Sequence, residues 1–289
     1  RLRNTEYGHK NTIVDPAQFG INHIVFPEKA AKNEIKKIIT QPSSIDIESF
    51  KDDKVTLVGI LIETSSPLIG RTKENVELSN PYIRHKLVLI YRNGESFIPH
   101  SDTLYHKDDY IYIVAKTEDI SEVQTMTGNP NYEINNIMIL GCGKIGRLLA
   151  KSLEDTYSVT IIEKNEDKAK EFSSKFKSTL MLSGDGLDVD FLESENIRDI
   201  DCFIAVSENE QTNLLSSMIV KDFGVKQVIT HITTTNYYKV LKNMDLSIVI
   251  SKNISAVNEI LQYIRTEQEN IRISRYEDLE LEAVELRVN

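Results

Sequence analysis

The dominant pattern in this chain, from about residue 135 to residue 265, is the alternation of short β-branched runs with longer amphipathic stretches. Short apolar runs are typical of buried strands, and a 3.6-residue apolar period is typical of helices packed on them. The pattern predicts strands at residues 137–140, 159–162, 179–182, 202–205, 228–230 and 248–250. It predicts helices at residues 145–153, 166–176, 209–223, 237–244 and 254–264. Six strands with intervening helices make one complete α/β unit with a doubly wound parallel sheet, which we assign to residues 133–265.

Residues 45–120 follow a different pattern, with several strand candidates and a short helix candidate. The strands are expected at residues 55–62, 86–91, 95–98 and 110–114, and the helix at residues 72–78. Asn93-Gly94 lies between two of these strands and is the strongest short signal for a β-hairpin. The pattern predicts a small α+β domain, joined to the doubly wound unit by a linker at Thr127–Asn131.

The sequence also repeats itself at long range. The matched segments, in pairs, are 4–7 with 234–237, 24–26 with 248–250, 30–39 with 255–264, and 281–288 with 55–62. The simplest explanation is a tandem architecture, truncated at both ends, in which doubly wound and small domains alternate. Residues 1–40 would be the last third of a first doubly wound domain, and residues 270–289 the start of a second small domain. The strand at 281–288 is expected to lack its partners and to be covered by another copy or by flanking residues.

Composition narrows the classes of protein and partner. Of the 289 residues, 40% are apolar and 27% charged, which is typical of a soluble globular protein, and no apolar run approaches a bilayer span. We expect no secretory signal, because no basic segment followed by an apolar stretch opens the chain. The formal net charge of −10 argues against nucleic acid as the main partner. Two cysteines far apart in sequence predict neither a disulfide framework nor a metal site, and the expected compartment is the cytosol.

The segment Gly141-Cys142-Gly143-Lys144-Ile145-Gly146 matches the pattern G-x-G-x-x-G. Three glycines alone are a weak signal, but these follow an expected strand and open an amphipathic helix, which is the context of a dinucleotide-binding turn. Gly141 would allow the tight turn, Gly143 would let the backbone approach a diphosphate, and Gly146 would permit close helix–strand packing. The N-terminus of the helix, with its unpaired N–H groups and positive dipole end, would favour the phosphates.

Three further strand ends carry candidate ligand contacts. Glu163 ends the second strand, where a carboxylate can accept from ribose hydroxyls and repel a 2′-phosphate, so NAD or an adenine nucleotide is favoured over NADP. A solvated strand-end charge is the alternative. Ser183–Gly186 follows the third strand and borders the adenine or forms a plain turn. Ser207–Asn209 follows the fourth strand, and helix capping alone could explain it.

These residues resemble a known family. The glycine turn, Glu163, Gly184–Gly186 and the run Ser207–Asn213 are similar to the TrkN domain, also called the RCK N-terminal domain, which is Rossmann-like. Residues 45–117, including Ser66–Gly70 and Ile98-Pro99, resemble its companion, the TrkA C-terminal or RCK C-terminal domain. The tandem order is that of the TrkA family, the NAD-binding subunits of Trk potassium uptake systems.

The resemblance implies a regulator that binds nucleotide without consuming it. It implies a cytoplasmic homo-oligomer, a dimer or tetramer, that lies on the inner face of the cell membrane and docks on a TrkH-like potassium-translocating subunit. NAD(H) is the ligand it favours, with ATP/ADP as the alternative, and neither a catalytic residue nor a metal is implied.

The family's binding residues carry over one by one. The resemblance places Gly141, Cys142, Gly143, Lys144, Ile145 and Gly146 along the diphosphate, Glu163 on the ribose, Asp185 and Gly186 by the adenine, and Val206 and Ser207 beside the glycine turn. The family also has an arginine after the fifth strand that reaches the phosphates. Arg1 matches it in the truncated first domain, whereas the second has His231. A neutral imidazole attracts phosphate less than a guanidinium, so we expect weaker or pH-dependent occupancy there, or no ligand contact.

An NAD-dependent oxidoreductase is the alternative class. It would need an acid/base residue directed at the nicotinamide, and no histidine–carboxylate or tyrosine–lysine arrangement stands out in the sequence. His100 and His106 are expected on surface loops of the small domain. A channel gating ring would use the same domains, but only a fused pore segment would favour it. We therefore expect a binding protein rather than an enzyme.

Overall fold

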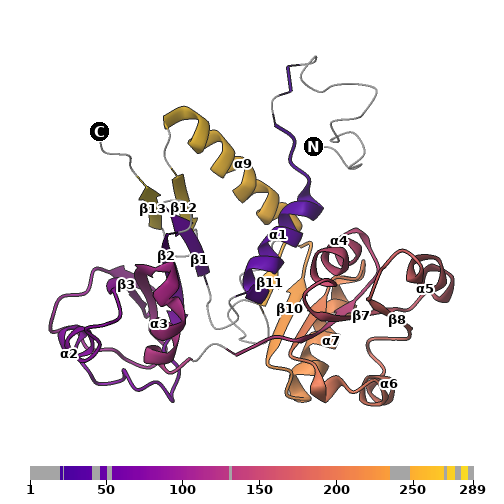
Figure 1. Ribbon diagram of the computed structural model, residues 1–289, viewed down its shortest axis with the longest axis horizontal. Coiled ribbons are helices and arrows are strands. Elements are labelled where there is room, and N and C mark those ends of the chain that lie inside the picture. The colour runs from indigo at the N-terminus through magenta and orange to yellow at the C-terminus, as the bar shows by residue number, and fades with distance from the viewer. Residues whose placement is uncertain are drawn as a thin grey trace. The chain divides into compact units, whose positions relative to one another are not determined.

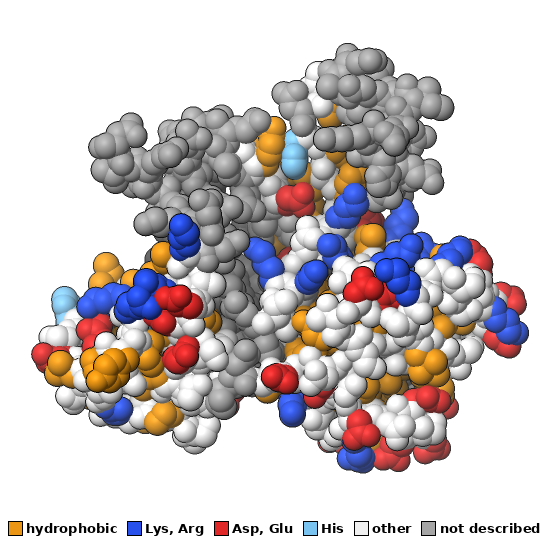
Figure 2. Space-filling view, in the orientation of Figure 1, with side chains coloured by type: hydrophobic (Ala, Val, Ile, Leu, Met, Phe, Trp, Pro, Cys, Tyr) orange, Lys and Arg blue, Asp and Glu red, His pale blue; other side chains and the backbone are white. Residues whose placement is uncertain are grey.

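The computed structural model describes residues 20–21, 23–40, 46–50, 54–129, 132–234, 248–269, 272–276 and 281–285. The chain forms two compact units. One unit combines residues 1–39 with residues 133–260, and the other combines residues 40–132 with residues 261–289 (Figure 1). On the face seen in Figure 2, positive and negative side chains are interspersed on each unit.

The first unit is built around a six-stranded sheet in which every strand is parallel to its neighbours. Its strands are β6 (Asn136–Leu140), β7 (Ser158–Glu163), β8 (Leu180–Ser183), β9 (Cys202–Ala205), β10 (Gln227–His231) and β11 (Ile248–Ile250). The order across the sheet is β11-β10-β9-β6-β7-β8. This is the strand order of a doubly wound Rossmann sheet, whose direction of winding reverses between β6 and β9. The predicted α/β fold class is confirmed.

Helices cover both faces of this sheet because the central strands are apolar on both sides. They are α4 (Lys144–Leu153), α5 (Glu166–Ser173), α6 (Val189–Ser194), the 3-10 helix η4 (Ile197–Asp199), α7 (Glu210–Asp222) and α9 (Lys252–Glu269). Met138 and Leu140 face the core formed with α6, η4 and α7. On the opposite face, the Ile139 side chain lies beside Gly146 of α4. The order and winding place the ends of β6 and β9 at the edge where ligands bind in such sheets.

Helix α1 (Pro27–Thr40) belongs to this unit and lies near β11 in Figure 1. It buries an apolar stripe that includes Ala31, Ile35 and Ile39, and the Gln227 side chain of β10 donates a long hydrogen bond, 3.5 Å, to the Ile38 carbonyl. Residues 24–26, which match the β11 segment in the sequence repeat, have no regular secondary structure. The expected helix at 237–244 lies outside the described residues, as do residues 1–19. Helix α6 and the 3-10 helix η4 of this unit were not expected from the sequence.

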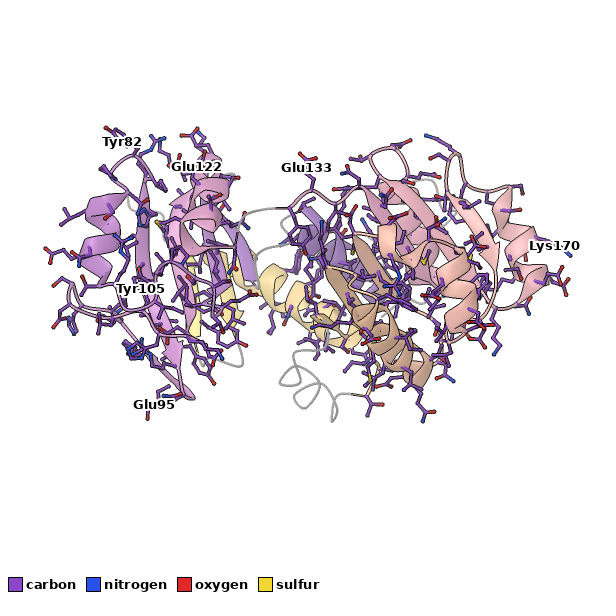
Figure 3. All side chains as sticks on the ribbon, turned by 90° about the horizontal axis from the view of Figure 1, so that it is seen from below. Tyr82, Glu95, Tyr105, Glu122, Glu133 and Lys170 are labelled. Atoms are coloured by element: carbon purple, nitrogen blue, oxygen red, sulfur yellow. The ribbon has the colours of Figure 1, made fainter. Side chains whose placement is uncertain are left out.

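The second unit contains a five-stranded sheet in the order β1-β2-β5-β3-β4. Its strands, all antiparallel to their neighbours, are β1 (Asp46–Phe50), β2 (Val55–Leu61), β3 (His85–Arg92), β4 (Glu95–Phe97) and β5 (Tyr110–Lys116). Helices α2 (Lys73–Ser79) and α3 (Ile120–Thr127) accompany it, with the 3-10 helix η3 (Thr117–Asp119). Asn93 and Gly94 both adopt positive φ, as the predicted hairpin turn requires. Tyr105, labelled in Figure 3, is 1% exposed and lies in the core of this unit.

The C-terminal segment forms a two-stranded antiparallel ribbon of β12 (Arg272–Tyr276) and β13 (Leu281–Glu285). The predicted strand at 281–288 is therefore present over residues 281–285. The expectation that it lacks partners within the chain is wrong, because β12, which the sequence pattern did not reveal, pairs with it along its length.

Candidate nucleotide-binding site

The glycine turn joins the end of β6 to the start of α4 and is closely packed at its first and last glycines. Gly141 has φ +105°, and a Cβ there would lie 2.6 Å from the Cα of Ser207 and 2.7 Å from its backbone nitrogen. A Cβ on Gly146 would collide with the carbonyl oxygen of Gly141. Both positions therefore require glycine for the fold itself, whatever the site binds.

Gly143 differs from the other two glycines of the turn. Its φ is −74°, which any residue can adopt, and a Cβ there would meet only the Val206 carbonyl oxygen, at 3.9 Å. Gly143 is also the N-cap of α4, and no side chain caps this helix, whereas Asn165, Asp188 and Asn209 cap α5, α6 and α7. The first N–H groups of α4 thus open towards free space, which fits a diphosphate that packs against bare backbone.

Glu163 ends β7 with its carboxylate against the glycine turn. Oε2 accepts from the backbone N–H of Cys142 at 3.0 Å, and Oε1 accepts from the N–H of Asn165 at 3.1 Å. The ammonium of Lys168, in the first turns of α5, lies 3.0 Å from Oε2. Burial alone would raise the pKa of Glu163, but the Asn165 N–H, Lys168 and the Cys142 N–H together hold this pKa below its usual value. Glu163 is therefore ionised and fixed in position rather than a freely solvated charge.

The loop after β8 places Asp185 and Gly186 at the same edge of the sheet. Asp185 forms a 2.6 Å ion pair with Lys164 and accepts from the N–H of Leu187, and these contacts lower the pKa of Asp185. A Cβ on Gly186 would lie 2.5 Å from the Leu140 side chain, so this loop packs directly on the end of β6. The loop therefore lies against the strand that leads into the glycine turn.

Asn213 of α7 connects the loops after β9 and β10. Its Oδ1 accepts from the backbone N–H of Ser207 at 2.9 Å and from the Ser207 hydroxyl at 2.6 Å. Its amide donates to the carbonyl oxygens of Ser207 and His231, both at 3.1 Å. Since Asn213 is only 1% exposed, these bonds are shielded from water and fix the two loops relative to one another.

A cavity of about 430 Å³ opens at this edge of the sheet. It is lined by Pro27, Glu28, Gly143, Lys144, Ile145, Val206, Ser207, Glu208, His231, Thr233 and Lys252. Five of the predicted residues, from the glycine turn and the loop after β9, therefore share one cavity with His231. Glu163, Asp185 and Gly186 lie outside this lining, on the β7–β8 side of the glycine turn. Cys142 is fully buried, so only its backbone can contribute to the site. Arg1 lies outside the described residues.

His231 ends β10 and is 5% exposed. Its Nε2 has no hydrogen-bond partner among the residues that the structure describes. Burial, with a smaller contribution from the nearby Lys252, lowers the pKa of His231 to about 4, so the imidazole is neutral at neutral pH. The departure from arginine therefore removes a fixed positive charge from this strand end, as the sequence suggested. It leaves a buried polar nitrogen that a ligand could satisfy.

Sequence reasoning missed Lys168, Asn213, Glu28 and Lys252. Lys168 follows Glu163 by five residues across a turn, and no simple spacing rule reveals such a contact. A signal for the last two did exist in the repeat. Glu28 follows the matched segment 24–26 by two residues, and Lys252 follows 248–250 by two, so the cavity lining includes equivalent positions of opposite charge.

The strand order, the glycine turn on a helix N-terminus and the acidic end of β7 define a Rossmann-type nucleotide-binding domain. The sequence model of the TrkA-N domain matches residues 137–252. This part of the chain therefore belongs to the TrkA-N domain family, and the resemblance stated from the sequence is confirmed.

Curated relatives extend the match over most of the chain. The Trk system potassium uptake protein TrkA homolog 2 of Methanosarcina mazei is 31% identical over 252 residues, covering 86% of this chain and 56% of the relative. The Trk system potassium uptake protein TrkA of Vibrio alginolyticus is 30% identical over 266 residues, covering 92% of this chain and 58% of the relative. The chain thus spans little more than half the length of these relatives.

Solved structures show the same fold. The GsuK RCK domain superposes with a TM-score of 0.57 at 14% identity, covering 89% of this chain and 56% of that structure. The GsuK channel bound to NAD superposes with a TM-score of 0.54 at 13% identity, covering 86% of this chain and 45% of that structure. Among the described residues, every helix is too short or too polar to cross a membrane, and no cluster of His, Cys, Asp and Glu could hold a metal ion.

Proposed function

We propose that this chain is a nucleotide-sensing regulator in a Trk-type potassium uptake system. NAD(H), or alternatively ATP or ADP, binds at the glycine turn as an effector and is not consumed. Copies of the chain assemble and act on a membrane potassium-translocating subunit at the cytoplasmic face. The tandem arrangement of domains, with residues 1–40 and 270–289 as partial domains, is part of the same proposal.

The observation that carries the proposal is the open space at Gly143. Packing requires glycine at positions 141 and 146, whereas Gly143 faces a cavity. Gly143 also begins α4, which, unlike α5, α6 and α7, has no side-chain cap. A fold that bound nothing would have no need of bare backbone there. The curated relatives named as TrkA proteins and the NAD complex of the GsuK channel support a nucleotide ligand and a potassium transport role.

Each residue has a definite part in holding such a ligand. The first N–H groups of α4 would donate to the diphosphate, and Lys144 would lie beside it. The carboxylate of Glu163 would accept from the ribose, and the Asp185-Gly186 loop would border the adenine. Binding regulates only if the ligand has different affinities for two conformations, so its occupancy shifts their populations.

The test of this proposal combines binding with two readouts of its consequence. We expect NADH or ATP to bind the purified chain, and bound NADH to stay reduced in the presence of a panel of carbonyl substrates. Hydrogen exchange should change where the chain passes between its two units, near residues 39–40, 132–133 and 260–261. Steady oxidation of NADH by any metabolite would favour the oxidoreductase alternative, and unchanged exchange at these junctions would contradict a regulatory role.

A further inference from the structure

The carboxylate that should hold the ribose is already engaged by a residue of the chain itself. Glu163 Oε2 accepts from the Cys142 N–H and pairs with the Lys168 ammonium, both at 3.0 Å. Oε1 accepts only from the Asn165 N–H among the hydrogen bonds of the described residues, at 3.1 Å. The side chains of Glu163 and Lys168 are 11% and 30% exposed, so this ion pair is partly shielded from water.

A ribose diol competes with Lys168 for this carboxylate. Each carboxylate oxygen offers about two lone-pair directions, and a pair of ribose hydroxyls would take one on each oxygen. Oε1 has room for one hydroxyl, but Oε2 is filled by a backbone N–H, which cannot move away, and by a lysine, which can. Binding of both hydroxyls therefore requires the Lys168 ammonium to leave Oε2.

The charged groups around Glu163 and Lys168 determine how this site responds to a ribose phosphate. Lys164 and Asp185 form an ion pair next to Glu163 and Lys168, so these four groups sum to zero charge rather than to the bare negative charge expected from Glu163 alone. A nucleotide with a phosphate on the ribose 2′-oxygen keeps only its 3′-hydroxyl as a donor, which Oε1 can accept, so Lys168 can stay on Oε2 while its ammonium also meets the phosphate oxygens. A free 2′-hydroxyl offers no such compensation.

We propose that Lys168 sets the selectivity of this site at the ribose 2′ position. It opposes nucleotides with a free 2′-hydroxyl by competing for Glu163, and it favours nucleotides with a 2′-phosphate by serving as their counter-ion. Lys168 is thus a specificity-determining residue, and the site tolerates NADP(H)-type ligands better than Glu163 by itself would allow. This inference rests on the proposed nucleotide site.

The test is the ratio of the NADH and NADPH dissociation constants, measured by calorimetry in the wild-type chain and in three variants. AMP and adenosine 2′,5′-bisphosphate provide a second pair that isolates the adenosine end. Lys168→Met keeps the aliphatic stem and should raise the preference for NADH by about tenfold or more, the effect expected when a charge-assisted hydrogen bond is lost. Lys168→Arg keeps the charge and should stay close to wild type.

Lys170→Met is the matched control. Lys170 projects from the same helix, is 71% exposed and pairs only with Glu166 at 2.6 Å among the described ion pairs, so its loss should leave the ratio unchanged (Figure 3). A ratio that is the same in Lys168→Met and Lys170→Met, with NADH still bound, would overturn the role of Lys168 and leave the proposed function intact. Failure of every nucleotide to bind the wild-type chain would overturn both.

Discussion

Glu163 shows how a residue identified from its position acquires its chemistry from its contacts. The sequence located a carboxylate at the end of the second strand but could not reveal that it fixes the backbone of the glycine turn through the Cys142 N–H. That contact makes Glu163 both a structural acceptor and the expected ribose ligand. The same is true of His231, whose burial, not visible in the sequence, determines its charge.

Replacement of Glu163 by glutamine should weaken the binding of NADH more than the binding of NADPH. Because the variant loses a charged acceptor for the ribose hydroxyls, we expect NADH binding to weaken by about 1–3 kcal/mol and NADPH binding to weaken less. Calorimetry measures both, and thermal melting reports any loss at the Cys142 contact. Equal losses for the two nucleotides would remove Glu163 from the ligand site.

His231 should make the stability of the chain depend on pH. Its folded pKa of about 4 lies below its ordinary value of 6.5, so between these values the unfolded state binds more protons and stability falls as the pH falls. Glu210, Glu28 and Lys252 are the charged groups that influence it. From pH 7 to pH 5 we expect His231 to lower the free energy of unfolding by roughly 2 kcal/mol. The His231→Gln variant should therefore lose roughly 2 kcal/mol less over this range than wild type. Chemical denaturation at both pH values measures the free energy of unfolding. An equal loss in wild type and His231→Gln would show that His231 is not buried as described.

At the scale of elements, the six strands of the parallel sheet could be predicted, whereas β1, β12 and the contacts between the loops could not. Short apolar runs indicate these six strands in the sequence, and all six were placed within about two residues of their observed ends. Helix α6 was missed because only Leu192 of its six residues is buried, too little for a helical period. Residues 24–26 match β11 in the sequence repeat, but the repeat alone does not show whether a segment forms a strand, and these residues have no regular secondary structure.

Asn213 makes the loops after β9 and β10 act together. Its replacement by alanine would remove the hydrogen-bond partner of the buried His231 carbonyl and of the half-buried Ser207 backbone, which should cost roughly 2–3 kcal/mol or more and weaken nucleotide binding. Asn209→Ala is the matched control, because it removes only the side-chain cap of α7 and should cost about 1 kcal/mol with no change in nucleotide affinity. Thermal melting and calorimetry on both variants test this prediction. Equal effects of the two replacements on nucleotide affinity would show that Asn213 does not position these loops for binding.

At the scale of the whole molecule, one face of α9 carries apolar side chains that the described residues leave open. Val257 and Ile260, on the part of α9 that belongs to the first unit, are 49% and 42% exposed, and their spacing places them on one side of the helix. A contiguous exposed apolar face of this kind marks an interface. We expected another copy of the chain to cover the C-terminal strand, but the exposed face of α9 is the better candidate for a contact with another copy.

Ile260→Glu should therefore shift the chain towards monomer. Light scattering at micromolar concentration should show an oligomer for wild type and a lower mass for the variant, because a carboxylate cannot be buried unpaired in an apolar contact. Leu78→Glu, on an exposed apolar side chain of α2 in the other unit, is the control and should keep the wild-type mass. A monomeric wild-type chain would contradict assembly through this face.

The most direct test of nucleotide binding at the glycine turn is to measure binding to a chain in which Gly143 is replaced by alanine. The added methyl group has free space in the structure, so the melting temperature should stay within a few degrees of wild type. The same methyl would occupy the place where a diphosphate meets the backbone, so the affinity for NADH and ATP should fall by at least about tenfold. A folded Gly143→Ala variant that binds either nucleotide as tightly as wild type would contradict the placement of the ligand at this turn.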